Sequence, residues 1–130
     1  MSYMPKAKSD HYQTPERVFD ILEEFGYKAR FFFDPCPFHS TFDGLKTDWQ
    51  EWNYVNAPYL LIGEFVHKAY NEFCKENSSI LLIPTNKTDK DWWHNYIALF
   101  DFKIIWIRGR LTFKNEKNPA GSPHCLVIMD

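Results

Sequence analysis

The stretch that most constrains the fold is Trp52–Tyr59, where an aromatic and apolar run ends in an amide, a proline and a ring. Trp, Tyr and Val favour β-strands, and Pro58 cannot donate a ladder hydrogen bond, so the strand must end before it. Ala57 precedes this proline and is therefore biased to extended geometry. Helical periodicity follows over 60–77. The stretch predicts a strand, a tight loop and a helix, and open α/β sheets bind ligands at the carboxyl ends of such strands.

The polar groups of this loop suit a planar base with an exocyclic amine. Asn56 offers a carbonyl acceptor and an amide donor, and the carbonyl of Ala57 offers a second acceptor. Two acceptors can hold both amine hydrogens while the base stacks on the ring of Tyr59. A purely structural turn is the alternative interpretation of these four residues.

Composition limits the classes of protein to consider. The 130 residues suit one domain. The aromatic content is high, with 12 Phe, 7 Tyr and 5 Trp, and we expect these rings to divide between the core and a stacking surface. A net charge of −2 excludes a uniformly basic nucleic-acid binder, so phosphate contacts would need a local patch. We expect neither a membrane span nor a signal peptide. Three widely spaced cysteines predict reduced thiols and a cytoplasmic location.

The rest of the chain alternates between helical and strand patterns. We predict a flexible arm over 1–10 and one domain over 11–130. Thr14 is the predicted N-cap of the first helix, with Pro15 at its first position and Gly26 closing it. Further helices are predicted over 60–77 and 89–99, and strands at 29–33, 52–55, 79–83, 102–107 and 125–129. This order predicts an α/β domain with a mostly parallel sheet of about five strands, covered on both faces, with antiparallel pairing near the C-terminus.

Polar residues follow several of the predicted strands: Asp34, Asn56, Thr85–Thr88 and Arg108–Arg110. The parallel strands among these would open at one edge of the sheet, so their polar residues could line one cleft. A simple loop cap is the alternative role for Asp34. No Gly-x-Gly-x-x-Gly follows the strand at 29–33, which disfavours a nicotinamide or flavin cofactor.

Other candidate sites are weaker. Cys36 and His39, with His94 and Cys125, lack a matching second pair at zinc spacing, so no metal site is expected. A Cys–His nucleophile is disfavoured because Cys36 lies between two prolines with nothing to stabilise a thiolate. Residues 87–117 carry seven basic side chains against four acidic ones, interleaved with Trp92, Trp93, Trp106 and Phe113. This region predicts either a modest phosphate-binding face with stacking rings or a solvated face over core aromatics.

Together these segments resemble the phage-type DNA N6-adenine methyltransferases of the Asn-Pro-Pro-Tyr class, here with Asn-Ala-Pro-Tyr. The resemblance covers the chain from Tyr12 onward and rests on short motifs in the family's order: Tyr12-Gln13-Thr14-Pro15, Phe33-Asp34-Pro35-Cys36, Asp43-Gly44-Leu45 with Trp49, Tyr54-Val55-Asn56-Ala57-Pro58-Tyr59, Phe65-Val66 with Lys68-Ala69, Leu81-Leu82-Ile83-Pro84, Thr88-Asp89 with Trp92-Trp93-His94, and Ile107-Arg108-Gly109-Arg110-Leu111 with Phe113.

The resemblance implies a reduced Rossmann-like methyltransferase fold, S-adenosylmethionine as cofactor and duplex DNA as partner. It implies that a flipped adenine is held by the catalytic residues Asn56, Ala57, Pro58 and Tyr59. The implied cofactor-binding residues are Tyr12, Thr14, Pro15, Asp34, Pro35, Cys36, Asp43, Leu45 and Asn56. The implied nucleic-acid contacts are Lys87, Trp92, Arg108 and Arg110.

Two departures from the family pattern bear on these expectations: Ala57, and the segment Pro119-Ala120-Gly121-Ser122-Pro123, which only loosely resembles the family's small-residue and proline segment. Ala57 replaces a proline, which removes rigidity but keeps the carbonyl acceptor and the extended bias. The chain is also expected to leave no room for a separate target-recognition domain, which favours a short recognition site or a relaxed sequence preference. The alternatives are a catalytically silent nucleic-acid or cofactor-binding module of the same fold, and a methyltransferase that acts on RNA or a nucleoside.

Overall fold

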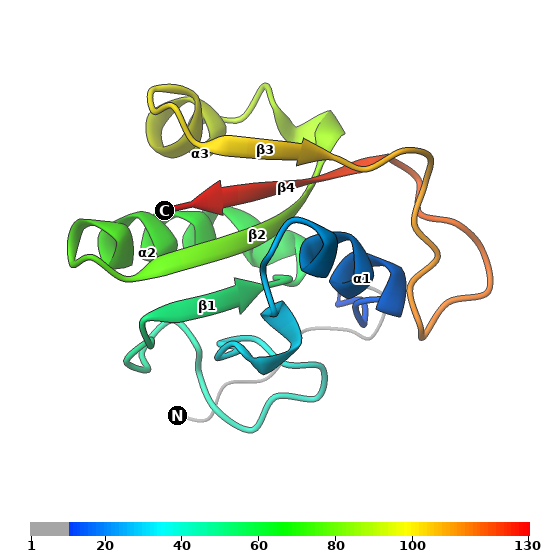
Figure 1. Ribbon diagram of the computed structural model, residues 1–130, viewed down its shortest axis with the longest axis horizontal. Coiled ribbons are helices and arrows are strands. Elements are labelled where there is room, and N and C mark those ends of the chain that lie inside the picture. The colour runs from blue at the N-terminus through cyan, green and yellow to red at the C-terminus, as the bar shows by residue number, and fades with distance from the viewer. Residues whose placement is uncertain (1–10) are drawn as a thin grey trace.

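The structure, a computed structural model, describes residues 11–130 (Figure 1). The arm predicted over 1–10 lies outside the described residues. The described residues form one four-stranded sheet with helices on both faces. None of these helices combines the length and the apolar character that crossing a membrane requires.

The run ahead of Asn56 forms strand β1 (Trp52–Val55), as predicted, and β1 pairs in parallel with β2 (Ser78–Pro84). Strand β4 (His124–Met129) lies antiparallel between β2 and β3 (Lys103–Trp106), so the strand order is β1-β2-β4-β3. Strands β2 and β3 are both antiparallel to β4, and β1 is parallel to β2, so β1, β2 and β3 run in the same direction. Their carboxyl ends therefore share one edge of the sheet, at the right of Figure 1.

Three helical segments cover this sheet. Helix α1 (Glu16–Glu24) packs on one face through an apolar stripe that includes the fully buried Val18 and Leu22. Helix α2 (Ile62–Cys74) covers the other face. Beside it lies α3 (Asp91–Trp93), which continues as a π-helix over His94–Ala98. Each face has its own apolar cluster, so the sheet is buried on both sides, as the sequence predicted.

The predicted strand at 29–33 is wrong. Ala29–Phe31 forms a 3-10 turn, and only Phe33 bridges to β1, where its N–H donates to the Trp52 carbonyl at 3.2 Å and its carbonyl accepts from Tyr54 N–H at 2.9 Å. Phe31 is 81% exposed. The ladder stops after one residue because the chain turns away at Asp34, whose carboxylate accepts the N–H of Cys36 at 3.0 Å.

The sheet is therefore smaller and more mixed than predicted. It has four strands instead of about five, and only the β1–β2 pair is parallel. The pairing is thus not mostly parallel and the predicted Rossmann-like sheet is not confirmed, whereas the antiparallel pairing expected at the C-terminal end is confirmed. The helix predicted over 60–77 begins with a 3-10 turn at Tyr59–Leu61 and becomes α-helical at Ile62.

Candidate active site

The side chain of Asn56, one residue beyond β1, is held in a fixed orientation. Its Nδ2 donates to the backbone carbonyl of Tyr12 at 2.5 Å and to Thr14 Oγ1 at 3.0 Å. A backbone carbonyl can only accept, so the amide nitrogen must face Tyr12, and both amide hydrogens are used. Within the described residues no hydrogen bond engages Asn56 Oδ1 or the carbonyl oxygen of Ala57. Two acceptors are therefore left for a ligand.

Thr14 belongs to this arrangement and is not the N-cap of α1. Pro15 occupies the N-cap position, and no side chain caps the helix, so the predicted Thr14 cap is wrong. The Thr14 hydroxyl instead lies 2.9 Å from the hydroxyl of Tyr54, a buried residue of β1. The hydrogen bonds from Tyr54 to Thr14 and from Asn56 to Thr14 thus connect the segment before α1 to the end of β1.

A cavity of about 250 Å³ lies against this network. It brings together five of the predicted cofactor-binding residues, and its lining is His11, Tyr12, Gln13, Thr14, Phe19, Asp34, Cys36, Phe38, Asn56 and Lys114. Burial raises the pKa of Asp34 to about 6, partly offset by the N–H of Cys36. No ion pair within residues 11–130 reaches the Asp34 carboxylate. The cavity therefore holds a half-buried acid without a cationic partner from the described chain.

Cys36 lies in the wall of this cavity as a neutral thiol. Burial raises its pKa well above the ordinary value, and the nearby Asp34 adds to the shift, while a hydrogen bond from the Asn56 backbone lowers it in part. A thiol held in this form is a poor nucleophile. No group of three His, Cys, Asp or Glu residues that could hold a metal ion occurs in the part of the chain that the structure describes.

A second, aromatic cavity of about 140 Å³ adjoins the first. The ring of Tyr12 lies 5.1 Å from that of Tyr59 and 5.3 Å from that of Phe113, centroid to centroid. Tyr12 lines both cavities, so they share part of their walls. The remaining walls come from the loop after β3: Glu116, Asn118, Pro119, Ala120 and Gly121. Asn56 and Tyr59 thus face different cavities with a shared wall.

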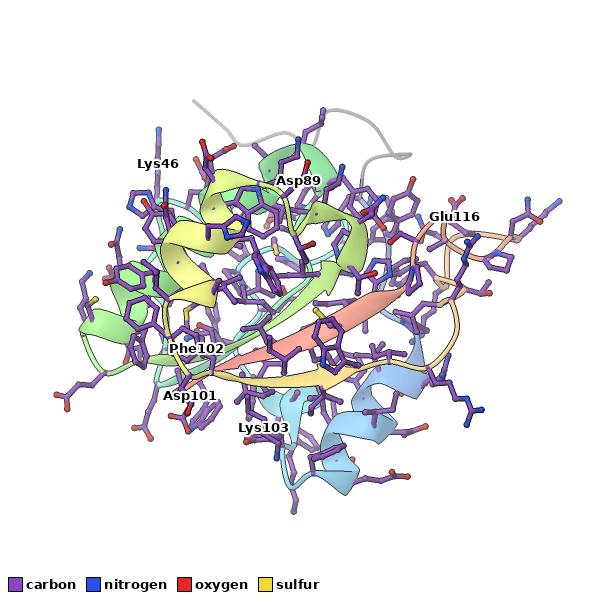
Figure 2. The ribbon with its side chains drawn as sticks, turned by 90° about the horizontal axis from the view of Figure 1, so that it is seen from above. Lys46, Asp89, Asp101, Phe102, Lys103 and Glu116 are labelled. Atoms are coloured by element: carbon purple, nitrogen blue, oxygen red, sulfur yellow. The ribbon has the colours of Figure 1, made fainter. Side chains whose placement is uncertain are left out.

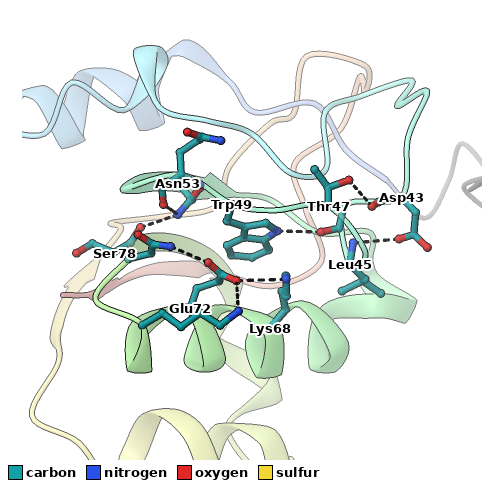
Figure 3. Close-up of polar contacts among 12 residues, drawn as sticks. Asp43, Leu45, Thr47, Trp49, Asn53, Lys68, Glu72 and Ser78 are labelled. Atoms are coloured by element: carbon teal, nitrogen blue, oxygen red, sulfur yellow. Dashed lines mark hydrogen bonds and ion pairs between the residues drawn. The ribbon is translucent and has the colours of Figure 1, made fainter.

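Asp43 and Leu45, two of the predicted cofactor contacts, line neither cavity. The Asp43 carboxylate accepts Leu45 N–H at 3.0 Å, and its backbone carbonyl accepts the hydroxyl of Thr47 at 2.8 Å (Figure 3). Trp49 Nε1 donates to the carbonyl of Gly44 at 2.8 Å. Pro15 and Pro35 also lie outside both linings. The loop over 39–51 is therefore ordered by its own polar contacts.

Gly44 brings this loop into direct contact with the Asp34 turn. A Cβ at Gly44 would lie 1.7 Å from the backbone oxygen of Pro35. We expect Gly44→Ala to lower the free energy of unfolding by at least about 2 kcal/mol, because backbone must move to make room. Chemical denaturation measures the loss. Gly121→Ala is the matched control, since no atom lies within 4 Å of its Cβ, and equal effects of the two changes would contradict the close approach.

The predicted nucleic-acid contacts are spread along the carboxyl edge of the sheet. Lys87 ends a 3-10 turn after β2, and Arg108 and Arg110 are exposed after β3, with Gly109 between them at φ +75°. Figure 2 shows Glu116 of the same loop beyond one end of β3, opposite Asp101 and Phe102 at the other. Trp92 is half-buried and packs against Gly63 of α2. A Cβ at Gly63 would lie 2.8 Å from the Trp92 ring.

Sequence patterns did not identify two histidines of this region. His11 Nε2 donates to the backbone carbonyl of Asn56 at 3.0 Å, and His124 Nε2 lies 3.1 Å from the hydroxyl of Tyr59. These contacts join residues 45 and 65 positions apart. No motif or spacing in the sequence points to either histidine.

One comparison with known proteins identifies the family of this chain. A search of curated proteins and a search of solved structures found no match. The family model described as DNA N-6-adenine-methyltransferase (Dam) matches residues 1–128, which is nearly the whole chain and includes both cavities and the Asn56 loop. The family's description implies methylation of adenine in DNA. The chain therefore belongs to the Dam family of DNA N-6-adenine-methyltransferases.

Proposed function

We propose that this protein transfers a methyl group from S-adenosylmethionine to N6 of an adenine flipped out of DNA. The observation that carries the proposal is the Asn56 side chain, whose two amide hydrogens are bound internally and whose Oδ1 is left as an acceptor. This group lines the first cavity and is bonded to Tyr12, the residue shared with the aromatic cavity. An acceptor in the first cavity, hydrogen-bonded to the residue that also lines the second, suits a reaction between two bound molecules.

The first cavity fits the cofactor by its chemistry. The Asp34 carboxylate is a partner for the ammonium of the cofactor's amino-acid part, and no ion pair from the described residues engages it. The rings of Tyr12, Phe19 and Phe38 suit a sulfonium cation and an adenosine ring. When bound, S-adenosylmethionine supplies an electrophilic methyl group.

The second cavity suits the target base. Tyr12, Tyr59 and Phe113 give it aromatic walls on which a flipped purine can stack. Asn56 Oδ1 and the Ala57 carbonyl would accept the two hydrogens on N6 and localise its lone pair, which the ring otherwise delocalises. Positioning and electrostatic support would then suffice without a dedicated general base. Pro58, at ψ 139°, keeps the loop extended although Ala57 replaces the family's first proline.

The test is transfer of a radiolabelled methyl group from S-adenosylmethionine to unmethylated duplex DNA, followed by digestion to nucleosides. We expect N6-methyladenine as the product. Incorporation only into RNA or free nucleoside would replace DNA as the substrate while keeping the chemistry. Cofactor binding in calorimetry without transfer to any nucleic acid would indicate a silent binding module and overturn the proposal.

Arg110 is proposed to contact a DNA phosphate from its exposed position after β3. Arg110→Gln should weaken binding of a fluorescently labelled duplex and make the slope of log affinity against log salt shallower by about 1, because one fewer counterion is released. Lys75→Gln is the matched control, since Lys75 is an exposed basic residue at the C-terminal end of α2, away from the loop after β3, where it pairs with Glu72. An unchanged slope in Arg110→Gln would remove Arg110 from the interface.

A further inference from the structure

The hydroxyl of Tyr59 has a specific buried partner. It lies 3.1 Å from Nε2 of His124, which is 1% exposed, and Nδ1 of the same imidazole lies 3.2 Å from the backbone carbonyl of Ser122. A carbonyl only accepts, so Nδ1 carries the hydrogen and Nε2 is left as the acceptor. The direction of the contact follows: Tyr59 donates its hydroxyl hydrogen to His124.

The position of His124 is itself fixed by the sheet. It is the first residue of β4 and lies opposite Pro84 at the end of β2. Its backbone carbonyl accepts Ile107 N–H at 3.1 Å, and the ring of Phe113 meets its imidazole edge-on at 5.4 Å. An acceptor held by backbone, sheet and ring cannot follow Tyr59 if that side chain moves, so it can hold Tyr59 in place.

We infer that His124 is a positioning residue for methyl transfer: by accepting the Tyr59 hydroxyl it holds that ring as a wall of the aromatic cavity. Tyr59 needs such an anchor because it lies half-buried on a short 3-10 turn, Tyr59–Leu61. The hydroxyl is at the far end of the ring from the backbone, so one hydrogen bond there restricts both side-chain torsions. The inference rests on the proposed function and assigns His124 no contact with the substrate.

The protonation state of His124 agrees with this role. Burial lowers the pKa of His124 to about 4, and the bond to Ser122 opposes that shift only in part. The imidazole is therefore neutral at neutral pH, with Nε2 available as an acceptor. Burial also raises the pKa of Tyr59 to about 12, so its hydroxyl keeps the hydrogen that it donates.

A double-mutant cycle on methyl transfer tests the inference. Tyr59→Phe removes the donor and keeps the ring, and His124→Leu removes the acceptor. We expect each to lower kcat about fivefold, the worth of one neutral hydrogen bond, and the double variant to lose no more than either alone. KM for S-adenosylmethionine should stay unchanged, because neither residue lines the first cavity. His124→Gln, which keeps an acceptor, should recover part of the loss.

His94→Leu is the matched control, since His94 is exposed on the π-helix and lines neither cavity. Losses that multiply in the double variant would overturn the inference while leaving the proposed function intact. Absence of transfer by the wild-type protein would overturn both.

A spectroscopic measurement is independent of the stability of His124→Leu. Nitrogen-15 NMR of the wild-type protein should show the Nδ1–H tautomer of His124, and Tyr59→Phe should shift its Nε2 resonance. An Nε2–H tautomer, or an Nε2 resonance that Tyr59→Phe leaves in place, would overturn the inference without any activity assay.

Discussion

Asn56→Ala is expected to lower the rate of methyl transfer by about 10² to 10³-fold, the cost of removing one fixed polar group aimed at the reacting atom. The change removes Oδ1, one of two proposed acceptors for the hydrogens on N6. It also removes the donor that Tyr12 O and Thr14 Oγ1 share, so the wall between the two cavities loses a polar tie. Single-turnover transfer to duplex DNA measures the effect.

Cofactor binding by Asn56→Ala should remain largely intact, because the groups proposed to bind the amino-acid part of S-adenosylmethionine are elsewhere in the first cavity. Calorimetric titration separates this from unfolding. Asn95→Ala, an exposed position on the π-helix, is the matched control and should leave transfer unchanged. Retained turnover in Asn56→Ala would contradict the proposed role of the loop.

The sequence correctly predicted that Asp34 lies beside Asn56, but not the secondary structure of the segment before it, 29–33. The apolar run at 29–33 satisfies the pattern of a buried strand, but a short run of this kind does not distinguish a strand from other buried segments. Pairing with β1 begins and ends at Phe33, because the chain turns at Asp34 and Cys36. One bridge is enough to hold Asp34 at the carboxyl end of β1, so it still lines a cavity with Asn56.

The aromatic cavity was beyond what local patterns could reveal. The prediction of the strand, loop and helix around Asn56 depended on neighbouring residues and is confirmed. The contact between Tyr59 and His124 depends on β4 entering the sheet between β2 and β3, which no local pattern specifies. Sequence patterns thus identified the acceptor loop but not what holds its aromatic residue.

Asp34→Asn is expected to weaken binding of S-adenosylmethionine by about 30-fold or more, because the ammonium of the cofactor loses a partly buried charge partner. Binding by the wild-type protein should depend on pH in a defined direction. With the pKa of Asp34 raised to about 6 in the free protein, affinity should rise as pH increases to about 6 and then level off, and be about tenfold weaker at pH 5 than at pH 7. Calorimetric titration of both proteins across this range measures the dependence.

The same substitution should stabilise the fold, because the site holds a carboxylate where burial disfavours it. The ordinary pKa of Asp34 is 3.8, so the folded protein binds its proton more tightly than the unfolded chain and loses stability as pH rises from about 4 to about 6. Asp34→Asn lacks this cost, so its free energy of unfolding at pH 7 should exceed that of the wild-type protein by about 1–3 kcal/mol. Asp48→Asn, at an exposed position in the 39–51 loop, is the control for both measurements. If Asp34→Asn binds the cofactor with the wild-type pH dependence, Asp34 is not the group that pairs with the ammonium of the cofactor. If Asp34→Asn is no more stable than the wild-type protein at pH 7, burial does not destabilise the Asp34 carboxylate.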